Sequence, residues 1–569
     1  MKNKVAGRIR FLSVAIFLVA AFFSTKLFFL QIVKGDEYAE LADRQYLKSA
    51  KTFLNRGSIY FSRRDGVLVP AATLKQQFIL SLNPKLIQNP ENVYELLSSQ
   101  IDINKEFFQH HVERDSAYEK IADNLDQQTA DQIRSLNLRG VDIAKEKKRI
   151  YPAGSLASHV VGLMSYYNND FVGTYGLEKH YNDVLTHKQT GSFASFFAEI
   201  FLNLADEVKS SESKSPKEGD LILTIEPIVQ GVLEKELESL VNKYQAEGAG
   251  AILMDPNTGD ILAMAAWPDF IPGEKITDIE VLTNPLVERV FEIGSVIKPL
   301  TLAAGLDMKV ITPETTYNDL GQVTIDNYQI SNFDKKGRGV VDMQRVLNDS
   351  LNTGAIFVMR QMGRDSFRKY MLSFGLGQKT GIDLPGEVGG LVSNLDSQRE
   401  VEYATASFGQ GLAITPIGAI RAFAILANGG KLVTPRVVKS IRYKDGSEKV
   451  FEPEIKEVVI SRRATDDITT MMIKAVDEAL LGGILKLNDY SVAGKTGTAQ
   501  IAKTDGRGYR DDAFLHAFFG FYPAYEPKII GYFYLINPQG VDYASETIPP
   551  SFMNVAKFLL NYYQIPPDR

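Results

Sequence analysis

A serine and a lysine three residues apart lie at the start of an apolar segment near the middle of the chain. They are Ser295 and Lys298, within residues 291–300. If residues 301–306 continue a helix, Ser295 lies at its opening and Lys298 lies one turn later on the same face. An amine in that position accepts the hydroxyl proton, which turns a weak serine into a nucleophile. The same spacing recurs in a polar run at Ser211 and Lys214, so the pair needs partners elsewhere in the chain.

The length and composition exclude several classes of protein. A chain of 569 residues exceeds what one core usually supports, so we expect at least two domains. A formal net charge of −6 argues against a nucleic-acid binder, because little would drive counterion release from phosphates. The sequence contains no cysteine, which excludes thiolate metal sites and disulfides. Its six histidines show no metal-binding spacing, so we predict neither a metal nor another cofactor.

The N-terminal region predicts a membrane anchor. Residues 11–33 are mostly apolar and approach the ~20 residues that span a bilayer. Basic residues in the preceding segment, 1–10, place that tail in the cytoplasm and the bulk of the chain outside. A cleaved signal peptide is the alternative, because residues 11–23 alone have the length of its apolar region. No clear Ala-x-Ala site follows, so we favour an uncleaved, single-pass signal anchor.

Residues 34–216 form the next predicted domain. Alternating residues on either side of an Asp-Gly turn at Asp65 and Gly66 indicate a β-hairpin. Residues 90–138 have a largely helical pattern. The polar stretch 209–219 is typical of an exposed loop or linker, which places a domain boundary near residue 217.

The remaining residues, 217–569, predict an α/β domain. Residues 220–225 read as a strand, and Pro227 opens a helix that extends to about residue 246. Two mostly apolar strands, 250–254 and 259–264, flank a turn and predict an antiparallel hairpin buried on both faces. The helix that begins near Ser295 follows this hairpin.

A second motif, Ser350-x-Asn352, lies downstream. The spacing also occurs at residues 81–83 and 135–137, but between Lys298 and Lys495 only this pair fits. The hydroxyl is suited to passing a proton from the lysine to a leaving group, and the amide both donates and accepts hydrogen bonds. Without context, a serine at a helix end and a capping asparagine would be the simpler interpretation.

A third motif, Lys495-Thr496-Gly497-Thr498, has strand-like flanks. Glycine in a strand often marks the close approach of another backbone, and a peptide substrate pairs with such a strand by β-addition. The lysine and the two threonine hydroxyls are suited to binding a carboxylate. The triplet recurs at residues 379–381, in a turn-rich segment with no strand after it, where we predict a loop.

The three motifs in this order are the signature of penicillin-binding proteins and serine β-lactamases. Further motifs resemble class B penicillin-binding proteins along nearly the whole chain. The closest resemblance is to the septal, FtsI-like members, on length and on the segment at Thr415, while an elongation-type relative stays open. The motifs include Arg56-Gly-x-Ile, Arg149-x-Tyr-Pro-x-Gly, His159-Val-x-Gly, Gly176-Leu-Glu178, Leu223-Thr-Ile225 and Ser407-Phe-Gly-Gln-Gly411.

The resemblance implies a fold and a set of site residues. The fold is a penicillin-recognising serine transpeptidase (β-lactamase-like) domain, with an antiparallel sheet flanked by helices, in residues 217–569. An elongated α+β pedestal of the dimerisation type (34–216) and one transmembrane helix precede it. The backbone N–H groups of Ser295 and Thr498 form the implied oxyanion hole. The implied catalytic residues are Ser295, Lys298 and Ser350, and the substrate-binding residues are Asn352, Lys495, Thr496, Gly497 and Thr498.

The implied function is that of a peptidoglycan D,D-transpeptidase. Such an enzyme crosslinks stem peptides through a serine acyl-enzyme during septal wall synthesis, is acylated by β-lactam antibiotics and has a possible carboxypeptidase side activity. Implied partners in the inner membrane are a SEDS-type glycosyltransferase (FtsW/RodA-like) and other division proteins. The alternatives are an elongation-type transpeptidase, a β-lactamase, a β-lactam sensor and a catalytically idle division scaffold. The pedestal region and the anchor argue against a β-lactamase, the single predicted span argues against a sensor, and the intact motifs argue against a scaffold.

Three positions depart from the family pattern. Ile293 stands where proline is usual, Ile297 where phenylalanine is common, and Glu226 where aspartate is usual. None of these departures removes a catalytic group. They bear on helix entry and packing, so they leave the efficiency of acylation open.

Overall fold

The computed structural model describes Lys26 and residues 55–167, 170–186, 218–503 and 508–569. The predicted anchor, residues 11–33, lies outside this part of the chain apart from Lys26, as does the polar stretch 209–217. Among the described residues, no helix combines the length and apolar character that a bilayer span requires. The chain divides into two compact units, one around residues 74–149 and the other formed by residues 56–73 and 150–569.

The smaller unit packs three helices against three strands. Its core is a cluster of buried aliphatic side chains together with Phe108. The predicted helical pattern is wrong at residues 119–125. They form a strand that pairs antiparallel with β2, with Phe78 opposite Leu125. Pairing with a neighbouring strand outweighs the low strand propensity of this Glu- and Lys-containing segment. The elements are β2 (Leu68–Leu82), η2 (Pro84–Leu86), α3 (Pro90–Ser98), α4 (Lys105–Val112), β3 (Glu119–Leu125), α5 (Gln127–Ser135) and β4 (Val141–Ile150).

The larger unit begins with the hairpin predicted at Asp65 and Gly66. β1 (Ile59–Ser62) pairs antiparallel with the first part of β2, with Ser62 opposite Leu68, which confirms the hairpin. β1 also pairs parallel with β7 (Gly219–Leu223). Next along the sheet are β17 (Val438–Tyr443) and β18 (Glu448–Val450). Segments far apart in the sequence therefore share one sheet.

A buried ion pair fixes this first segment. The Nε of Arg56 lies 2.6 Å from Oε2 of Glu178, and both side chains are almost completely buried. The same guanidinium donates to the Glu178 carbonyl oxygen at 2.7 Å and to Oδ1 of Asn182 at 3.0 Å. The short elements that surround it are β5 (Met164–Tyr167), β6 (Asp170–Gly173), α6 (Ser158–Val161), α7 (Gly176–His180) and α8 (Asn182–Leu185).

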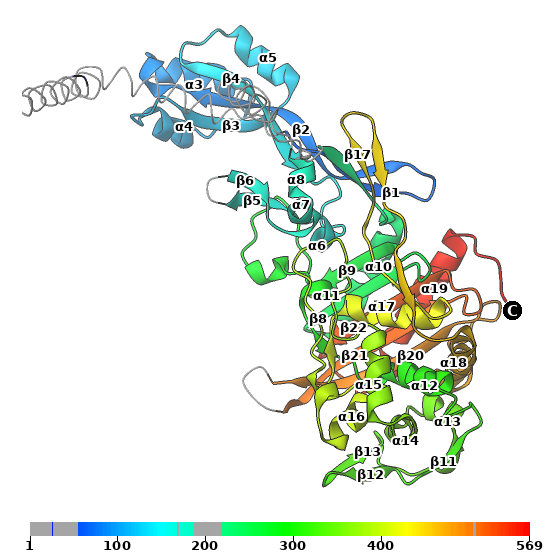
Figure 1. Ribbon diagram of the computed structural model, residues 1–569. Coiled ribbons are helices and arrows are strands. Elements are labelled where there is room, and N and C mark those ends of the chain that lie inside the picture. The colour runs from blue at the N-terminus through cyan, green and yellow to red at the C-terminus, as the bar shows by residue number, and fades with distance from the viewer. Residues whose placement is uncertain (1–25, 27–54, 168–169, 187–217, 504–507) are drawn as a thin grey trace, which may run out of the picture. The chain divides into compact units, whose positions relative to one another are not determined.

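A five-stranded antiparallel sheet forms the centre of the larger unit, in the order β20-β21-β22-β8-β9. Figure 1 shows strands from the middle of the chain (β8 and β9, green) beside strands near its end (β20 to β22, orange). β8 and β9 are the predicted apolar hairpin. The strands are β8 (Gly248–Met254), β9 (Ile261–Trp267), β20 (Ala493–Ala502), β21 (Tyr509–Tyr522) and β22 (Ile529–Ile536).

Helices cover both faces of this sheet, as the apolar pattern of β8 requires. Every residue of β8 is buried. Alternate residues contribute to different cores: Leu253 packs with α10 (Pro227–Tyr244) and α19 (Ile548–Tyr562), and Ile252 packs with the helices of the other face. Among those helices, α17 (Pro416–Ala427) contacts β8, β21 and β22, and all twelve of its residues are buried. Such a helix, apolar apart from the buried Arg421, is stable only inside a core.

Two of the departures from the family pattern fit this packing. The side chain of Glu226 caps α10, because Oε2 accepts the Val229 N–H at 2.7 Å and Oε1 accepts the Tyr562 hydroxyl at 2.8 Å. Glutamate therefore performs the capping that a shorter carboxylate would provide. Ile297 is buried in the core beside the sheet.

The remaining elements form the helical lobe around the sheet and the small hairpins on it. Their helices are α11 (Pro285–Glu288), α12 (Lys298–Asp307), α13 (Met343–Asn348), α14 (Asn352–Met362), α15 (Arg364–Ser373), α16 (Glu400–Ala406) and α18 (Arg462–Lys474), with the short turns η3 (Ile279–Leu282), η4 (Gly294–Ile297), η5 (Ser393–Asp396), η6 (Ala475–Ala479), η7 (Leu480–Gly483) and η8 (Ala544–Glu546). Their strands are β10 (Phe291–Glu292), β11 (Thr316–Asp319), β12 (Gln322–Ile325), β13 (Tyr328–Ser331), β14 (Gly339–Asp342), β15 (Ala413–Ile414), β16 (Lys431–Val433) and β19 (Ile455–Val458).

Candidate active site

Ser295 and Lys298 lie at the junction between a short turn and a buried helix. Ser295 belongs to the 3₁₀ turn η4, and Lys298 is the first residue of α12, with Pro299 next to it. Proline is favoured in the first turn of a helix, where its missing N–H costs nothing. The Nζ of Lys298 lies 2.9 Å from the Oγ of Ser295. The pair therefore has the hydrogen-bond geometry that serine activation requires.

The surroundings of Lys298 disfavour its charged form. The side chain is fully buried, and desolvation lowers its pKa well below the usual value for lysine. The nearby charge of Lys495 lowers this pKa further. Near neutral pH, a larger fraction of Lys298 than of an exposed lysine is consequently neutral and able to accept a proton.

Ser350 and Asn352 come together with this pair from the start of α14. The Nζ of Lys298 lies 3.1 Å from the Oγ of Ser350 and donates to its carbonyl oxygen at 2.5 Å. Ser350 has a φ of 52°, in the left-handed region that residues other than glycine rarely occupy. Asn352 is the first residue of α14, and its Nδ2 donates to the Ser331 carbonyl oxygen at 2.9 Å.

The third motif lies on β20, which is the end strand of the central sheet. Lys495 is buried, and its Nζ donates to the Thr496 carbonyl oxygen at 3.0 Å. Burial lowers the pKa of Lys495 to about 7. The Oγ1 of Thr498 accepts the Ala544 N–H at 3.0 Å, so the hydroxyl keeps its own proton for donation.

Gly497 allows β20 to approach the turn that carries the nucleophile. A Cβ on Gly497 would lie 2.4 Å from the carbonyl oxygen of Ile293. The glycine therefore marks a close backbone approach, as we expected, and the nearby backbone is that of the segment before Ser295. Ile293, the residue that replaces proline, is itself buried in the core.

The second Lys-Thr-Gly triplet makes contacts of its own in a loop. Residues 379–381 form the predicted loop. The carboxylate of Glu387 accepts the Thr380 hydroxyl and the Gly381 N–H, and the buried Arg421 donates to the Lys379 carbonyl oxygen at 3.2 Å. The other Ser-x-x-Lys match, at Ser211, lies outside the described residues.

Several residues at the site had no signal in the sequence. Ala544 reaches Thr498 across 46 residues of sequence. The Tyr509 hydroxyl donates to the carboxylate of Glu292 at 3.0 Å, next to the nucleophile turn, and burial raises the pKa of that carboxyl. Such contacts come from long-range packing and have no periodicity or spacing by which sequence reasoning could find them.

His159 is remote from this chemistry. Its Nε2 contacts the Val281 carbonyl oxygen at 2.9 Å, and its ring packs edge-on against Phe270. Burial lowers its pKa to about 4. In the part of the chain that the structure describes, no three or more histidine or acidic side chains are grouped to hold a metal ion.

The penicillin-recognising serine enzymes share one arrangement. A helical lobe packs on a five-stranded antiparallel sheet, and a serine and a lysine open a helix beside the end strand. Residues 249–556 match the family model of the penicillin-binding protein transpeptidase domain. Residues 52–222 match that of the penicillin-binding protein dimerisation domain. The chain belongs to the class B penicillin-binding proteins.

Named relatives and a solved structure agree with this assignment. The chain is 32% identical to stage V sporulation protein D of Bacillus subtilis, over 98% of this chain and 86% of that protein. It is 27% identical to the peptidoglycan D,D-transpeptidase FtsI of Buchnera aphidicola, over 97% of this chain and 94% of that one. Penicillin-binding protein 3 of Mycobacterium tuberculosis, solved with aztreonam, superposes with a TM-score of 0.64 at 26% identity, covering 75% of this chain and 92% of that chain.

Proposed function

We propose that this chain is a peptidoglycan D,D-transpeptidase that crosslinks stem peptides through an acyl-enzyme on Ser295 during septal wall synthesis. One observation carries the proposal: the buried Nζ of Lys298 lies within hydrogen-bond distance of the hydroxyls of both Ser295 and Ser350. A single amine so placed serves both to activate a nucleophile and to return the proton to a leaving group. Membership of the family supports the same reaction.

The first step is attack on the D-Ala-D-Ala amide. As the Oγ of Ser295 bonds to the carbonyl carbon, the neutral Nζ of Lys298 accepts its proton. General-base catalysis of this kind contributes about 10²–10⁴-fold to a rate. The backbone N–H groups of Ser295 and Thr498 would stabilise the oxyanion, and loss of one such donor typically costs about 3 kcal/mol of barrier.

The second step releases D-alanine. The carbon–nitrogen bond breaks, and the hydroxyl of Ser350 passes the proton from Lys298 to the departing amine. An ester between the remaining stem peptide and Ser295 is left on the enzyme. The strained backbone of Ser350 keeps its hydroxyl beside Lys298, which supports the role of a relay.

The end strand β20 holds the substrate. A stem peptide adds to its free edge as an extra strand, while the close packing of Gly497 keeps that edge next to Ser295. Lys495 pairs with the terminal carboxylate, and the negative charge of that group favours the protonated form of the lysine. The proposed binding residues are Asn352 for the peptide amide, and Lys495, Thr496, Gly497 and Thr498 for the terminal carboxylate.

The ester then transfers to an amine of a second stem peptide. The amine nitrogen attacks the ester carbonyl and gives up a proton to Lys298. The bond between the carbonyl carbon and the Oγ of Ser295 then breaks, and Lys298 returns a proton to that oxygen as the new amide forms. Attack by water instead gives the carboxypeptidase side reaction. A β-lactam presents its ring amide to the same serine, and its leaving nitrogen stays tethered, so the ester persists.

The cellular setting is also part of the proposal. We place residues 1–10 in the cytoplasm, 11–33 in the inner membrane, and the pedestal (34–216) and transpeptidase (217–569) domains outside. A SEDS-type glycosyltransferase (FtsW/RodA-like) and other division proteins are the proposed partners, because neither matched domain polymerises glycan strands.

Reconstitution tests the reaction. The full-length chain in vesicles, with a SEDS polymerase and lipid-linked precursor, should yield crosslinked muropeptides by mass spectrometry. Ser295→Ala should leave glycan strands without crosslinks, and crosslinking that survives this change would refute the mechanism. Depletion in cells tests the setting: filaments support septal work, and rounded cells would reassign the chain to elongation.

A further inference from the structure

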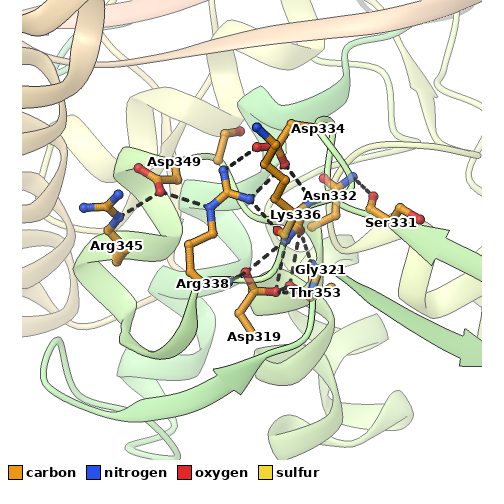
Figure 2. A network of polar contacts seen from close by, with 12 residues as sticks. Asp319, Gly321, Ser331, Asn332, Asp334, Lys336, Arg338, Arg345, Asp349 and Thr353 are labelled. Atoms are coloured by element: carbon orange, nitrogen blue, oxygen red, sulfur yellow. Dashed lines mark hydrogen bonds and ion pairs between the residues drawn. The ribbon is translucent and has the colours of Figure 1, made fainter.

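A buried carboxylate lies behind the Ser350-x-Asn352 motif. Asp319, the last residue of β11, is almost completely buried. Figure 2 shows it as part of a network of polar contacts. It accepts four donors: the N–H of Gly321 at 2.9 Å, the N–H of Arg338 at 3.0 Å, the Nδ2 of Asn332 at 3.0 Å and the hydroxyl of Thr353 at 2.8 Å.

The contact with Asp319 determines how the amide of Asn332 lies. A carboxylate oxygen accepts the amide N–H, so Nδ2 must face Asp319 and Oδ1 must face the other way. The Oδ1 of Asn332 accepts the backbone N–H of Thr353 at 3.2 Å, while the single hydroxyl hydrogen of Thr353 goes to Asp319 at 2.8 Å. Asp319 therefore holds Thr353 both directly and through Asn332.

Two consecutive residues of one segment hold two consecutive residues of another. Asn332 holds Thr353, and the carbonyl oxygen of the adjacent Ser331 accepts the Nδ2 of Asn352 at 2.9 Å. This contact uses one of the two amide hydrogens of Asn352. Its second hydrogen and its oxygen make no other hydrogen bond among the described residues, so they stay available to a ligand.

We infer that Asp319 and Asn332 are positioning residues that set the orientation of Asn352 toward the peptide amide of the substrate. The inference rests on the proposed function, in which Asn352 binds that amide. Neither residue touches the reacting atoms. Both act through Thr353 and Ser331, at the first turn of α14.

The side chains of Arg338 and Asp334 lie next to this network but do not hold Asn332 or Thr353 in place. Arg338 bonds to Asp334 at 2.8 Å through its side chain, but it reaches Asp319 only through its backbone N–H. Asp334 is partly exposed, and its carboxylate accepts from Arg338 and from the Lys336 N–H. The substitution Asp334→Asn therefore changes the rim of the network and serves as a matched control for Asp319→Asn.

Acylation kinetics with two ligands test the inference on the full-length protein. Penicillin G carries an acylamido side chain that resembles the peptide amide, and 6-aminopenicillanic acid lacks it. Asp319→Asn should lower the second-order acylation rate with penicillin G about tenfold, since small misplacements cost up to about 100-fold. The rate with 6-aminopenicillanic acid should change less than about twofold, and Asp334→Asn should leave both rates as in the wild type.

A second pair of variants tests the same contacts at Thr353. Thr353→Val removes the hydroxyl at nearly constant volume and should reproduce the ligand-selective loss, whereas Thr353→Ser keeps the hydroxyl and should restore the wild-type ratio. In Asn352→Ala, the further change Asp319→Asn should have no additional effect on penicillin G, because contacts acting through one residue are not additive.

Equal losses with both ligands would overturn the inference, as would additive effects of Asp319→Asn and Asn352→Ala. Those results would make the network a general support of the fold. Failure of the proposed function would give a different result, because the wild-type protein would then form no penicillin adduct on Ser295. If Asp319→Asn does not fold, the Thr353 pair decides the question alone.

Discussion

The Nζ of Lys298 lies 2.9 Å from the Oγ of Ser295 and 3.1 Å from the Oγ of Ser350. Ser295 precedes Lys298 by three residues and Ser350 follows it by 52, and the buried amine of Lys298 is the common neighbour of the two hydroxyls. A charged amine in this position would only donate to both hydroxyls, whereas a neutral amine accepts the serine proton. The protonation state of Lys298 is therefore the variable that controls acylation.

The dependence of acylation on pH follows from the two lysines. Acylation needs neutral Lys298, so its rate rises as pH increases through the lowered pKa of that group. Carboxylate binding needs charged Lys495, so it weakens as pH rises past about 7. The second-order acylation rate should be bell-shaped in pH, with its falling limb near neutrality.

Lys495→Arg tests the assignment of the falling limb. Arginine stays charged over the accessible range, so this limb should move to higher pH while the rising limb persists. Stopped-flow acylation by a fluorescent penicillin measures both limbs. A falling limb that is unchanged in Lys495→Arg would contradict the assignment to Lys495.

Gly497→Ala should slow acylation without unfolding the protein. The new methyl group would lie 2.4 Å from the Ile293 carbonyl oxygen and push β20 away from the nucleophile turn. Overpacking of this kind typically costs about 1–3 kcal/mol. Gly231→Ala is the control. Gly231 lies within α10, and a Cβ there would be 3.8 Å from the side chain of Leu156, so alanine fits and should stabilise the helix by about 0.5–1 kcal/mol. Wild-type acylation by Gly497→Ala would show that the close approach is not needed.

Glu178→Ala should destabilise the larger unit strongly. The change leaves the buried guanidinium of Arg56 without its carboxylate, and breaking a buried pair from one side typically costs about 3–5 kcal/mol. Arg368→Ala removes an exposed pair with Asp396 and should cost less than about 1 kcal/mol. Urea unfolding gives both free energies, and similar values for the two variants would contradict the prediction.

His159 should make the folded state sensitive to acid. Its pKa is about 4 in the folded protein against an ordinary value of 6.5, so the unfolded chain binds the proton more readily. The stability that neutral His159 gives is present above pH 6.5 and is lost as pH falls toward 4, by up to ~3 kcal/mol. His159→Gln should reduce the loss of unfolding free energy between pH 6.5 and 4, whereas the same change at the exposed His180 should not. If the unfolding free energies of the two variants depend on pH identically, His159 is not the source of the acid sensitivity.

Local pattern was enough to predict much of the fold. The apolar hairpin of β8 and β9, the helix that begins at Pro227 and the loop at residues 379–381 follow from periodicity, proline and turn residues. Residues 119–125 did not, because their strand depends on pairing with β2. Local composition cannot report a partner 40 residues away.

The sequence predicted some residues of the candidate site and missed others, for the same reason. Ser295, Lys298, Ser350, Asn352 and Lys495 were found because their motifs have fixed spacings and a fixed order. Asp319 and Asn332 were not, since each contacts Thr353 through a loop whose path depends on tertiary packing.

The acyl-enzyme itself gives the most direct test of the central claim. The full-length protein is incubated with penicillin G, and its intact mass and proteolytic peptides are measured beside those of Ser295→Ala. We predict one adduct per chain, located on the peptide that contains Ser295, and none on the variant. An adduct that persists in Ser295→Ala, or that maps to Ser211 or Ser350, would contradict the assignment of the nucleophile.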